Sequence, residues 1–228
     1  MKYNYNNVIK KLKSQASEKN RKGMARFGIN PKGTLGVSVP ILRKMAKDIG
    51  KNQKLSLRLW DSGIHETKLL AVFIGEPDKV TERQMEKWVK DIDSWDICDQ
   101  LCGNLFDKTP FAYKKTYQWV KREEEFVRRT GFVLMATLSV HDKKASNKKF
   151  EEFFPLIKKY SADERNFVKK AINWALRQIG KRNLALNKKA IKLAKEIQKI
   201  DSRSACWIAN DAIRELTSDP VQQRLKQK

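Results

Sequence analysis

The sequence predicts an all-α protein, and three observations carry this prediction. Apolar residues recur at helical spacing almost throughout the chain, whereas alternating stretches rich in β-branched residues are few. Only 10 glycines and 6 prolines interrupt the 228 residues, so we expect short connections between helices. With 40% hydrophobic residues the chain can bury a sizeable core, and we expect a single domain over residues 1–228.

The apolar spacing places the helices in order along the chain. They are expected at residues 3–18, 20–28, 39–50, 53–60, 65–75, 81–91, 94–106, 110–120, 124–140, 147–159, 162–180, 184–199 and 202–217. Loops are expected at Asn30–Gly33 and Gly75–Pro77, which contain proline and glycine. Asp93-Ser94 and Asp201-Ser202 offer acceptors to the first amides of the helices that follow, and Ser161–Glu164 has the pattern of a capping box.

A repeat relates two of these helices. Phe126-Val127-Arg128-Arg129 and Phe167-Val168-Lys169-Lys170 are displaced by 41 residues, and each opens an amphipathic helix preceded by acids. This period is typical of HEAT-like helical pairs. Such pairs bury their apolar faces only against neighbours, so they stack into a solenoid with a concave binding side. The sequence therefore predicts a HEAT-like (ARM/HEAT superhelical) repeat solenoid.

The charge of the chain indicates a polyanionic partner. Lysine and arginine number 49 against 26 aspartates and glutamates, which gives a net charge of +23. Such a field attracts polyanions, and nucleic acid is the default partner. Between Arg165 and Lys199 there are eleven basic residues and one acid, Glu196. This uneven distribution predicts a basic groove or face, because a surface kept basic only for solubility needs no such clustering.

The chain offers little for membrane insertion. The segment Met1–Asn7 has no apolar run, and the longest nearly unbroken apolar stretch, Gly131–Val140, is far too short to span a bilayer. We therefore expect a cytoplasmic protein that does not enter membranes and that associates with the nucleoid.

The cysteines and histidines suggest no metal centre. Cys98, Cys102 and Cys206 are an odd number, and two of them have helical spacing among apolar residues, so we expect reduced core thiols. The spacing of Cys98 and Cys102 does not suit a structural zinc site, and only His65 and His141 could complete one. We predict neither a metal nor a cofactor.

Trp95 and Asp99 form the most informative local pattern. They stand four residues apart on one predicted helix, so an indole and a carboxylate are surface neighbours in a very basic chain. Asp96 points further out and is most simply an acid favoured by the positive end of the helix dipole. Asp99 lies deeper in the helix at the margin of the apolar stripe. A role as a salt-bridged structural acid is the alternative for Asp99.

Two later helices carry further candidates. Arg128 and Arg129 open an almost wholly apolar helix and need anions, which could be phosphates or the nearby acids at 123–125 or Asp99. On the helix after Phe167, Lys170 and Arg177 mark a basic stripe, and we expect both to contact the nucleic acid. Trp174 falls at the seam between this stripe and the apolar one. The indole could pack at the core edge or meet a nucleic acid.

Three segments of the chain together resemble those of a known protein family. Ser94–Asp99, Val127–Thr130 and Lys170–Arg177 resemble the HEAT-like DNA alkylation repair glycosylases, the AlkD-like family, over about Met24 to Leu216. The resemblance implies that Trp95, Asp99, Arg129 and Trp174 line a concave, basic DNA-binding cleft, with Arg128 as a neighbour. It also implies excision of cationic N3- or N7-alkylated purines from double-stranded DNA by a monomeric enzyme.

Such a reaction requires only one catalytic carboxylate. A cationic alkylpurine is already a good leaving group, and cleavage builds positive charge on the sugar, as in glycoside hydrolysis. Asp99 would stabilise this charge and orient water, while the two indoles would contact the cationic nucleotide for about 0.5 to 2 kcal/mol. Arg129 would hold a flanking phosphate.

Two alternatives remain open from the sequence. A protein of the same family could bind DNA or branched DNA structures without excising bases. A HEAT-like scaffold could instead bind an acidic protein or RNA, although an aspartate inside its basic face would weaken such binding.

Overall fold

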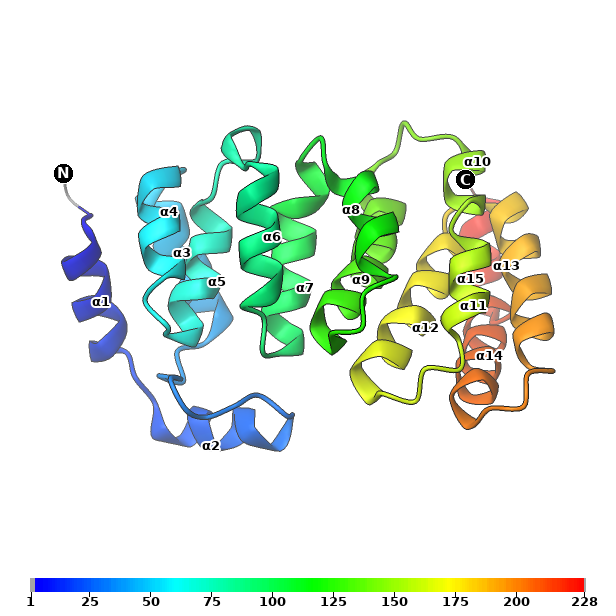
Figure 1. Cartoon of the computed structure of the whole chain (residues 1–228), viewed down its shortest axis with the longest axis horizontal. Coiled ribbons are helices and arrows are strands. Elements are labelled where there is room, and N and C mark those ends of the chain that lie inside the picture. The colour runs from blue at the N-terminus through cyan, green and yellow to red at the C-terminus, as the bar shows by residue number, and fades with distance from the viewer. Residues whose placement is uncertain (1–2, 228) are drawn as a thin grey trace. The chain divides into compact units, whose positions relative to one another are not determined.

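A computed structural model describes residues 3–227, and every regular element in that range is a helix (Figure 1). This confirms the predicted all-α class. The chain forms two compact units, unit 1 (Met1–Phe111) and unit 2 (Ala112–Lys228), and each is described by itself. The single domain expected over 1–228 stays a prediction, and its first two residues and its last lie outside the described range.

Unit 1 is built from paired helices. They are α1 (Tyr5–Ser14), α2 (Glu18–Arg26), α3 (Val39–Ile49), α4 (Gln53–Trp60), α5 (His65–Ile74), α6 (Glu82–Lys90) and α7 (Trp95–Asn104), with the 3-10 helices η1 (Pro77–Lys79) and η2 (Phe106–Lys108). α3 packs on α5, α5 packs on α7, and α4 packs on both α5 and α1. The rings of Trp60 and Trp88 stack with centroids 4.0 Å apart and join α4 to α6. α3, α5 and α7 thus form one row of neighbours, and α4 and α6 pack together beside it.

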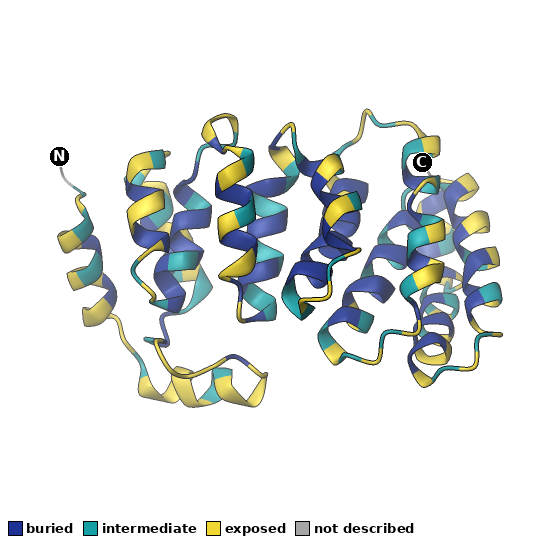
Figure 2. Ribbon diagram, viewed as in Figure 1, coloured by how far each residue is buried: buried dark blue, intermediate teal, exposed yellow. Residues whose placement is uncertain are grey.

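Unit 2 has its own row of packed helices. Its elements are α8 (Ala112–Trp119), α9 (Glu125–His141), α10 (Asn147–Glu151), α11 (Phe154–Tyr160), α12 (Asn166–Gly180), α13 (Leu184–Ile197), α14 (Arg203–Leu216) and α15 (Asp219–Lys226). α9 packs on α8 and α12, and α12 packs on α13 and α14. Every residue of α9 from Val127 to Ser139 is buried (Figure 2). This confirms that the apolar helix predicted here is central.

The 41-residue repeat corresponds to two neighbouring helices. Phe126 opens α9 and Phe167 opens α12, and their ring centroids lie 5.6 Å apart. Val127 and Val168, the next residues in the two repeats, are both buried. Equivalent positions of the repeat therefore stack on one another, which is the packing expected when each helical pair buries its apolar face against the next.

Several helix boundaries differ from the sequence prediction. The helix expected at 3–18 ends at Ser14, and residue 18 already belongs to α2. The helix expected at 147–159 is two helices, α10 and α11, because Pro155 stands in the first turn of α11 and cannot continue a preceding helix. The C-terminal helix α15 was not predicted, and Pro220 stands in its first turn. The helix expected from residue 162 begins at Asn166.

The predicted capping box at Ser161–Glu164 is wrong. Ser161 ends α11, and its hydroxyl donates to the Lys158 carbonyl. Glu164 instead accepts from the Ser204 amide in the first turn of α14. The Ser202 cap of α14 is confirmed, because its hydroxyl accepts from the Ala205 amide. Ser94 is at the N-cap position of α7 but makes no such bond.

Gly131 allows the close approach of α9 to the end of α8. A Cβ at this position would lie 2.7 Å from the backbone nitrogen of Val120, which cannot move aside as a side-chain end can. We expect Gly131→Ala to destabilise the fold by about 1 to 3 kcal/mol through overpacking. The measurement is urea unfolding followed by circular dichroism.

Gly23 in α2 is the matched control, because a Cβ there meets nothing within 4 Å. Gly23→Ala should be neutral or stabilise α2 by up to about 1 kcal/mol, since alanine has the higher helix propensity. Equal unfolding midpoints for the two variants would contradict the close approach at Gly131.

Candidate functional site

The Trp95 side chain is fixed at the start of α7. Trp95 is the first residue of the helix and is half-buried. Its Nε1 donates to the Phe27 carbonyl at 2.9 Å, so the loop after α2 holds the indole ring. The next turns bury Ile97, Cys98 and Leu101 against the unit. This core stripe leaves the tryptophan at its margin, as predicted.

A large hollow in unit 1 lies beside this indole. Its volume is about 900 Å³, which is in the range of ordinary ligand pockets. Its walls are mainly apolar and come from the α2 region, the start of α3, α5 and α7, and they include Met24, Phe27, Ile29, Val37, Leu69 and Trp95. Lysines and arginines of α2 stand at its edge, namely Lys19, Lys22 and Arg26. The hollow therefore combines an aromatic wall with a cationic rim.

Asp96 also lines the hollow but is engaged inside the protein. Its Oδ2 lies 2.8 Å from Nε2 of His65, and both side chains are largely buried. Burial raises the pKa of the Asp96 carboxyl, but hydrogen bonding and the charge of His65 outweigh burial, and the net pKa is lowered. Asp96 does lie in the first turn of α7, as predicted, but its side chain is largely buried against His65, so the prediction that it points outward is wrong. Its pairing with His65, 31 residues earlier, was not foreseen.

Asp99 lies one turn further along α7 and is half-buried. Its charge is close enough to act on Cys102, a fully buried thiol of the same helix. Burial, the hydrogen bond with Cys98 and the charges of Asp99 and Asp107 all raise the pKa of Cys102. The thiol is therefore protonated at neutral pH and unsuited to act as a nucleophile. Trp95 and Asp99 are four residues apart on α7 and share one helix face, to which Asp99 contributes a half-buried carboxylate.

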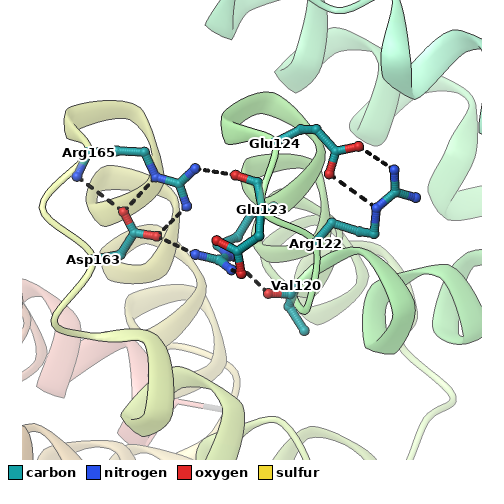
Figure 3. Close-up of polar contacts among 7 residues, drawn as sticks. Val120, Arg122, Glu123, Glu124, Asp163 and Arg165 are labelled. Carbon is teal, nitrogen blue, oxygen red and sulfur yellow. Dashed lines mark hydrogen bonds and ion pairs between the residues drawn. The ribbon is translucent and has the colours of Figure 1, made fainter.

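Arg128 lies inside a polar network at the start of α9. Its guanidinium donates to the Val120 carbonyl at 3.1 Å, to Asp163 Oδ2 at 2.9 Å and to Glu123 Oε1 at 2.8 Å, and it lies over the Tyr160 ring. Its side chain is only 8% exposed. Figure 3 shows Arg165 beside Asp163 and beside the Glu123 backbone, which its guanidinium also contacts. This geometry favours the structural alternative for Arg128 over a phosphate contact.

Arg129 is the neighbouring arginine and is also buried, with 4% of its surface exposed. Its Nη1 donates to the Phe167 carbonyl at 2.6 Å. Since Phe167 opens α12, Arg129 joins the first turns of two repeat-related helices within unit 2. This hydrogen bond ties Arg129 to the helix that carries Lys170 and Trp174.

Lys170 and Trp174 lie one turn apart on α12. Lys170 is exposed and has no hydrogen-bond or ion-pair partner within residues 3–227. Trp174 is half-buried between the buried neighbours Asn173 and Ala175, which matches the predicted seam position. No hydrogen bond or ring contact ties its indole to another residue of the described chain. This part of α12 therefore presents an available cation next to a partly accessible aromatic ring.

Arg177 differs from Lys170 because acids of α14 neutralise it. It forms ion pairs with Asp211 and Glu215, and Lys181 pairs with the same Glu215. The pKa of Glu215 is lowered, since the two cations outweigh the opposing effect of burial. Arg177 was predicted to contact DNA, and this geometry favours a role in joining α12 to α14.

The stretch from Arg165 to Lys199 is less uniformly positive than its sequence suggested. Acids from other elements pair with several of its cations, and these pairs include Arg165 with Asp163 and Lys189 with Glu151. The lysines of the stretch that are exposed without an ion pair are Lys170, Lys188, Lys192, Lys195 and Lys199. The exposed cations without an ion pair thus lie on α13, just after it at Lys199, and on α12 at Lys170.

The remaining predictions concern the cysteines, a metal site and membrane insertion. Cys98 and Cys102 are buried as expected, but Cys206 is exposed, and no disulfide joins any of the three. The described residues bring together no group of three or more His, Cys, Asp or Glu side chains suited to a metal ion. None of the helices within residues 3–227 is both long enough and apolar enough to cross a membrane.

Sequence reasoning missed the contribution of α2 to the site. Phe27 is 70% exposed, and it belongs to a segment so rich in basic and polar residues that nothing marked it as a pocket wall. An isolated phenylalanine directly after a basic helix was the available signal. The contact of Trp95 with the Phe27 carbonyl, 68 residues away, could not be read from spacing.

Comparisons with known proteins identify the family and the fold of this chain. The sequence matches the model of a family described as DNA alkylation repair enzymes over residues 8–216. No curated protein matches it. Among solved structures, it is similar to a protein from a family related to the HEAT-like repeat DNA glycosylases with affinity for branched DNA structures. The TM-score is 0.82 at 18% identity, and the match covers 98% of this chain and 96% of that one.

Two designed armadillo repeat proteins are also similar, one of them in complex with the peptide (KR)4. Their TM-scores are 0.36 and 0.39, at 15% and 13% identity, with 77% and 81% of this chain and 92% and 88% of theirs covered. The match to the HEAT-like glycosylase relative confirms the predicted HEAT-like repeat fold. The family model confirms the resemblance noted in the sequence. The chain belongs to the family of DNA alkylation repair enzymes.

Proposed function

We propose that this chain is a DNA glycosylase of base excision repair. Its substrate would be a cationic N3- or N7-alkylated purine in double-stranded DNA, and its reaction would be hydrolysis of the N-glycosidic bond. The observation that carries the proposal is the placement of Asp99. In a chain of net charge +23, a half-buried carboxylate stands one helical turn from an anchored indole. On a surface that only binds DNA, a carboxylate would weaken binding to the phosphates.

Asp99 would act on the sugar of the damaged nucleotide. As the bond to the base lengthens, the deoxyribose develops positive charge, which a fixed carboxylate stabilises without needing to move. The carboxylate would also orient the water that attacks the sugar carbon. The alkylated base leaves as a neutral purine, so no second acid is required to protonate it.

The aromatic and basic residues would hold the substrate. We assign contact with the cationic nucleotide to Trp95 of unit 1 and, separately, contact with DNA to Trp174 of unit 2; each ring is half-buried and can offer a π face. Lys170 would bind a backbone phosphate, because it is exposed and free of ion pairs in the described chain. Arg129 is buried and donates to the Phe167 carbonyl, so it would position α12, which carries Lys170 and Trp174, and would not contact the DNA itself. We propose that the protein acts as a monomer on nucleoid DNA in the cytoplasm.

A second candidate function is the binding of branched DNA structures without base excision. It is favoured by the similarity in fold to the family with affinity for branched DNA. Under this alternative, Asp99 would be a structural acid, and junction DNA would bind more tightly than a plain duplex.

The direct test is release of methylated bases. Duplex DNA treated with a methylating agent is incubated with the protein, and free 3-methyladenine and 7-methylguanine are measured by chromatography. We expect release well above that from DNA incubated alone. No release, together with intact duplex binding, would rule out the glycosylase. Competition between a four-way junction and a duplex of equal length then tests the second candidate.

A further inference from the structure

A basic pocket in unit 1 is not used by the proposed chemistry. It has a volume of about 360 Å³ and lies where the last turns of α3, α5 and α7 meet. Four cations line it, Arg43, Lys47, Lys51 and Lys108, and its other lining residues are Ala46, Gly50, Phe73 and Asn104. No acidic residue is among them. Four positive charges thus face one cavity without a counter-ion in its walls.

Three of these cations are held in place by the fold. The Arg43 guanidinium lies 4.5 Å from the centre of the Phe73 ring and donates to Gln100 Oε1 at 2.9 Å. Lys51 Nζ donates to the carbonyls of Phe73 and Gly75. Lys108 Nζ donates to the Asn104 carbonyl at 3.2 Å. Because the side chains are already ordered, an anion that binds here loses little affinity to side-chain ordering.

The arrangement costs electrostatic energy in the absence of an anion. Burial lowers the pKa of Lys51, and the positive charge of Lys108 lowers it further, against the opposing charge of Glu76. Glu76 itself pairs with Lys79 at 2.7 Å and accepts from the Gln53 amide. Glu76 therefore offsets only part of these effects, because the net pKa of Lys51 is lowered.

Helix capping explains only part of this cluster. Lysines near a helix C-terminus commonly bind the last carbonyls, and Lys51 and Lys108 do so for α5 and α7. Lys47 makes no hydrogen bond or ion pair within residues 3–227, yet it faces the same pocket. The Arg43 guanidinium is bound by side chains rather than carbonyls. Helix capping therefore does not explain why Arg43 and Lys47 face this pocket.

We propose that the pocket of Arg43, Lys47, Lys51 and Lys108 binds a backbone phosphate of the DNA. An arginine fork with lysines around it is the donor set that a phosphodiester prefers. The pocket shares α7 with the candidate catalytic residue, because Asn104 lines it and Gln100 holds Arg43. Asp99 and Asn104 are five residues apart, about 7.5 Å along a helix. A phosphate held here would therefore lie beside the helix that carries Asp99.

This inference rests on the proposed action on DNA but is tested without any base excision. The variant is Lys47→Gln with Lys108→Gln, and the matched control is Lys54→Gln with Lys90→Gln. All four lysines are exposed and belong to unit 1, and the control pair lies on α4 and α6, outside the pocket. Both variants lose two charges. Any difference between them therefore reports the pocket and not the net charge.

Binding of an unmodified fluorescent duplex is measured by anisotropy from about 50 to 200 mM salt. We expect the pocket variant to bind about tenfold more weakly at low salt. The slope of log K against log salt should become shallower by about 0.9, the value for one lost phosphate contact. The control should change the slope much less. Equal slopes in the two variants would overturn the proposal.

Titration with inorganic phosphate distinguishes a backbone phosphate from a free one. We expect no saturable binding of inorganic phosphate at millimolar concentration in an NMR titration of the wild-type protein. Saturable phosphate binding with an unchanged DNA slope would assign the pocket to a free anion and contradict the backbone site. Failure of methylpurine release by the wild-type protein would refute the glycosylase alone, since the slope is measured on undamaged DNA.

Discussion

Asp99→Asn is expected to abolish most release of methylated purines while duplex binding stays equal or becomes tighter. The amide has nearly the shape of the carboxylate but lacks the charge that stabilises the developing oxocarbenium ion. Loss of one preorganised electrostatic contact of this kind lowers a reaction rate by about 100-fold or more. Binding should not suffer, because a negative charge facing phosphates has been removed. Single-turnover release and anisotropy on the same DNA measure the two effects.

Asp96→Asn is the matched control on the same helix. Asp96 is bound to His65 and does not need to face the sugar in the proposed reaction. We expect its loss to change single-turnover release by a few-fold at most, while the unfolding midpoint falls because a largely buried pair is broken. A loss of release equal to that of Asp99→Asn would move the catalytic role to Asp96. Unchanged release by Asp99→Asn would remove Asp99 as the catalytic group.

Local spacing predicted the face of α7 well. Four-residue periodicity placed Trp95 at the margin of the stripe formed by Ile97 and Leu101, and the structure buries that stripe. Periodicity worked because a helix face depends on residues three and four apart. It could not reveal that the Phe27 carbonyl fixes the indole or that His65 binds Asp96, because both partners come from other helices or loops.

Charge could be counted from the sequence but not assigned to a surface. The run from Arg165 to Lys199 contains one acid, yet Asp163 and Glu215 neutralise Arg165 and Arg177 from outside it. The four-cation pocket shows the opposite case. Its members are scattered from Arg43 to Lys108, and only the packing of three helix ends brings them together. Ion pairing and convergence are tertiary properties, which composition does not contain.

The boundary of α12 decided the role of Arg128. A capping box at Ser161 would have placed Asp163 inside a helix, whereas the observed start at Asn166 leaves Asp163 in the preceding loop. There it receives hydrogen bonds from both Arg128 and Arg165. An error of a few residues in the predicted start of α12 therefore changes the expected role of Arg128 from a phosphate contact to a buried structural contact.

Arg128→Met is expected to destabilise the protein by about 1 to 3 kcal/mol, because the Val120 carbonyl loses this donor and Asp163 keeps only Arg165 as a cation. Methionine keeps the length of the side chain and its packing on Tyr160 but cannot satisfy Asp163 or the Val120 carbonyl. Urea unfolding at neutral pH measures the loss. Arg214→Ala is the control, since Arg214 is 80% exposed in its ion pair with Asp211 and should cost less than about 1 kcal/mol.

The pH dependence of this loss identifies the ion pair as its cause. Burial raises the pKa of Asp163, but its hydrogen bonds with Arg165 and Arg128 outweigh burial, and the net pKa is lowered. A carboxyl with a lowered folded-state pKa stabilises the fold above its unfolded pKa of about 3.9, and this stability is lost as the pH falls through the folded value. The difference in unfolding free energy between wild type and Arg128→Met should therefore shrink below about pH 4.

The same variant separates the two interpretations of Arg128. If the guanidinium only joins α9 to the loop before α12, folded Arg128→Met protein should bind duplex DNA with the wild-type salt slope. If it contacts a phosphate, the slope should become shallower by about 0.9. Because the side chain is 8% exposed and has three acceptors in the protein, we expect an unchanged slope and a large loss of stability. A shallower slope with little loss of stability would return Arg128 to the DNA-binding surface.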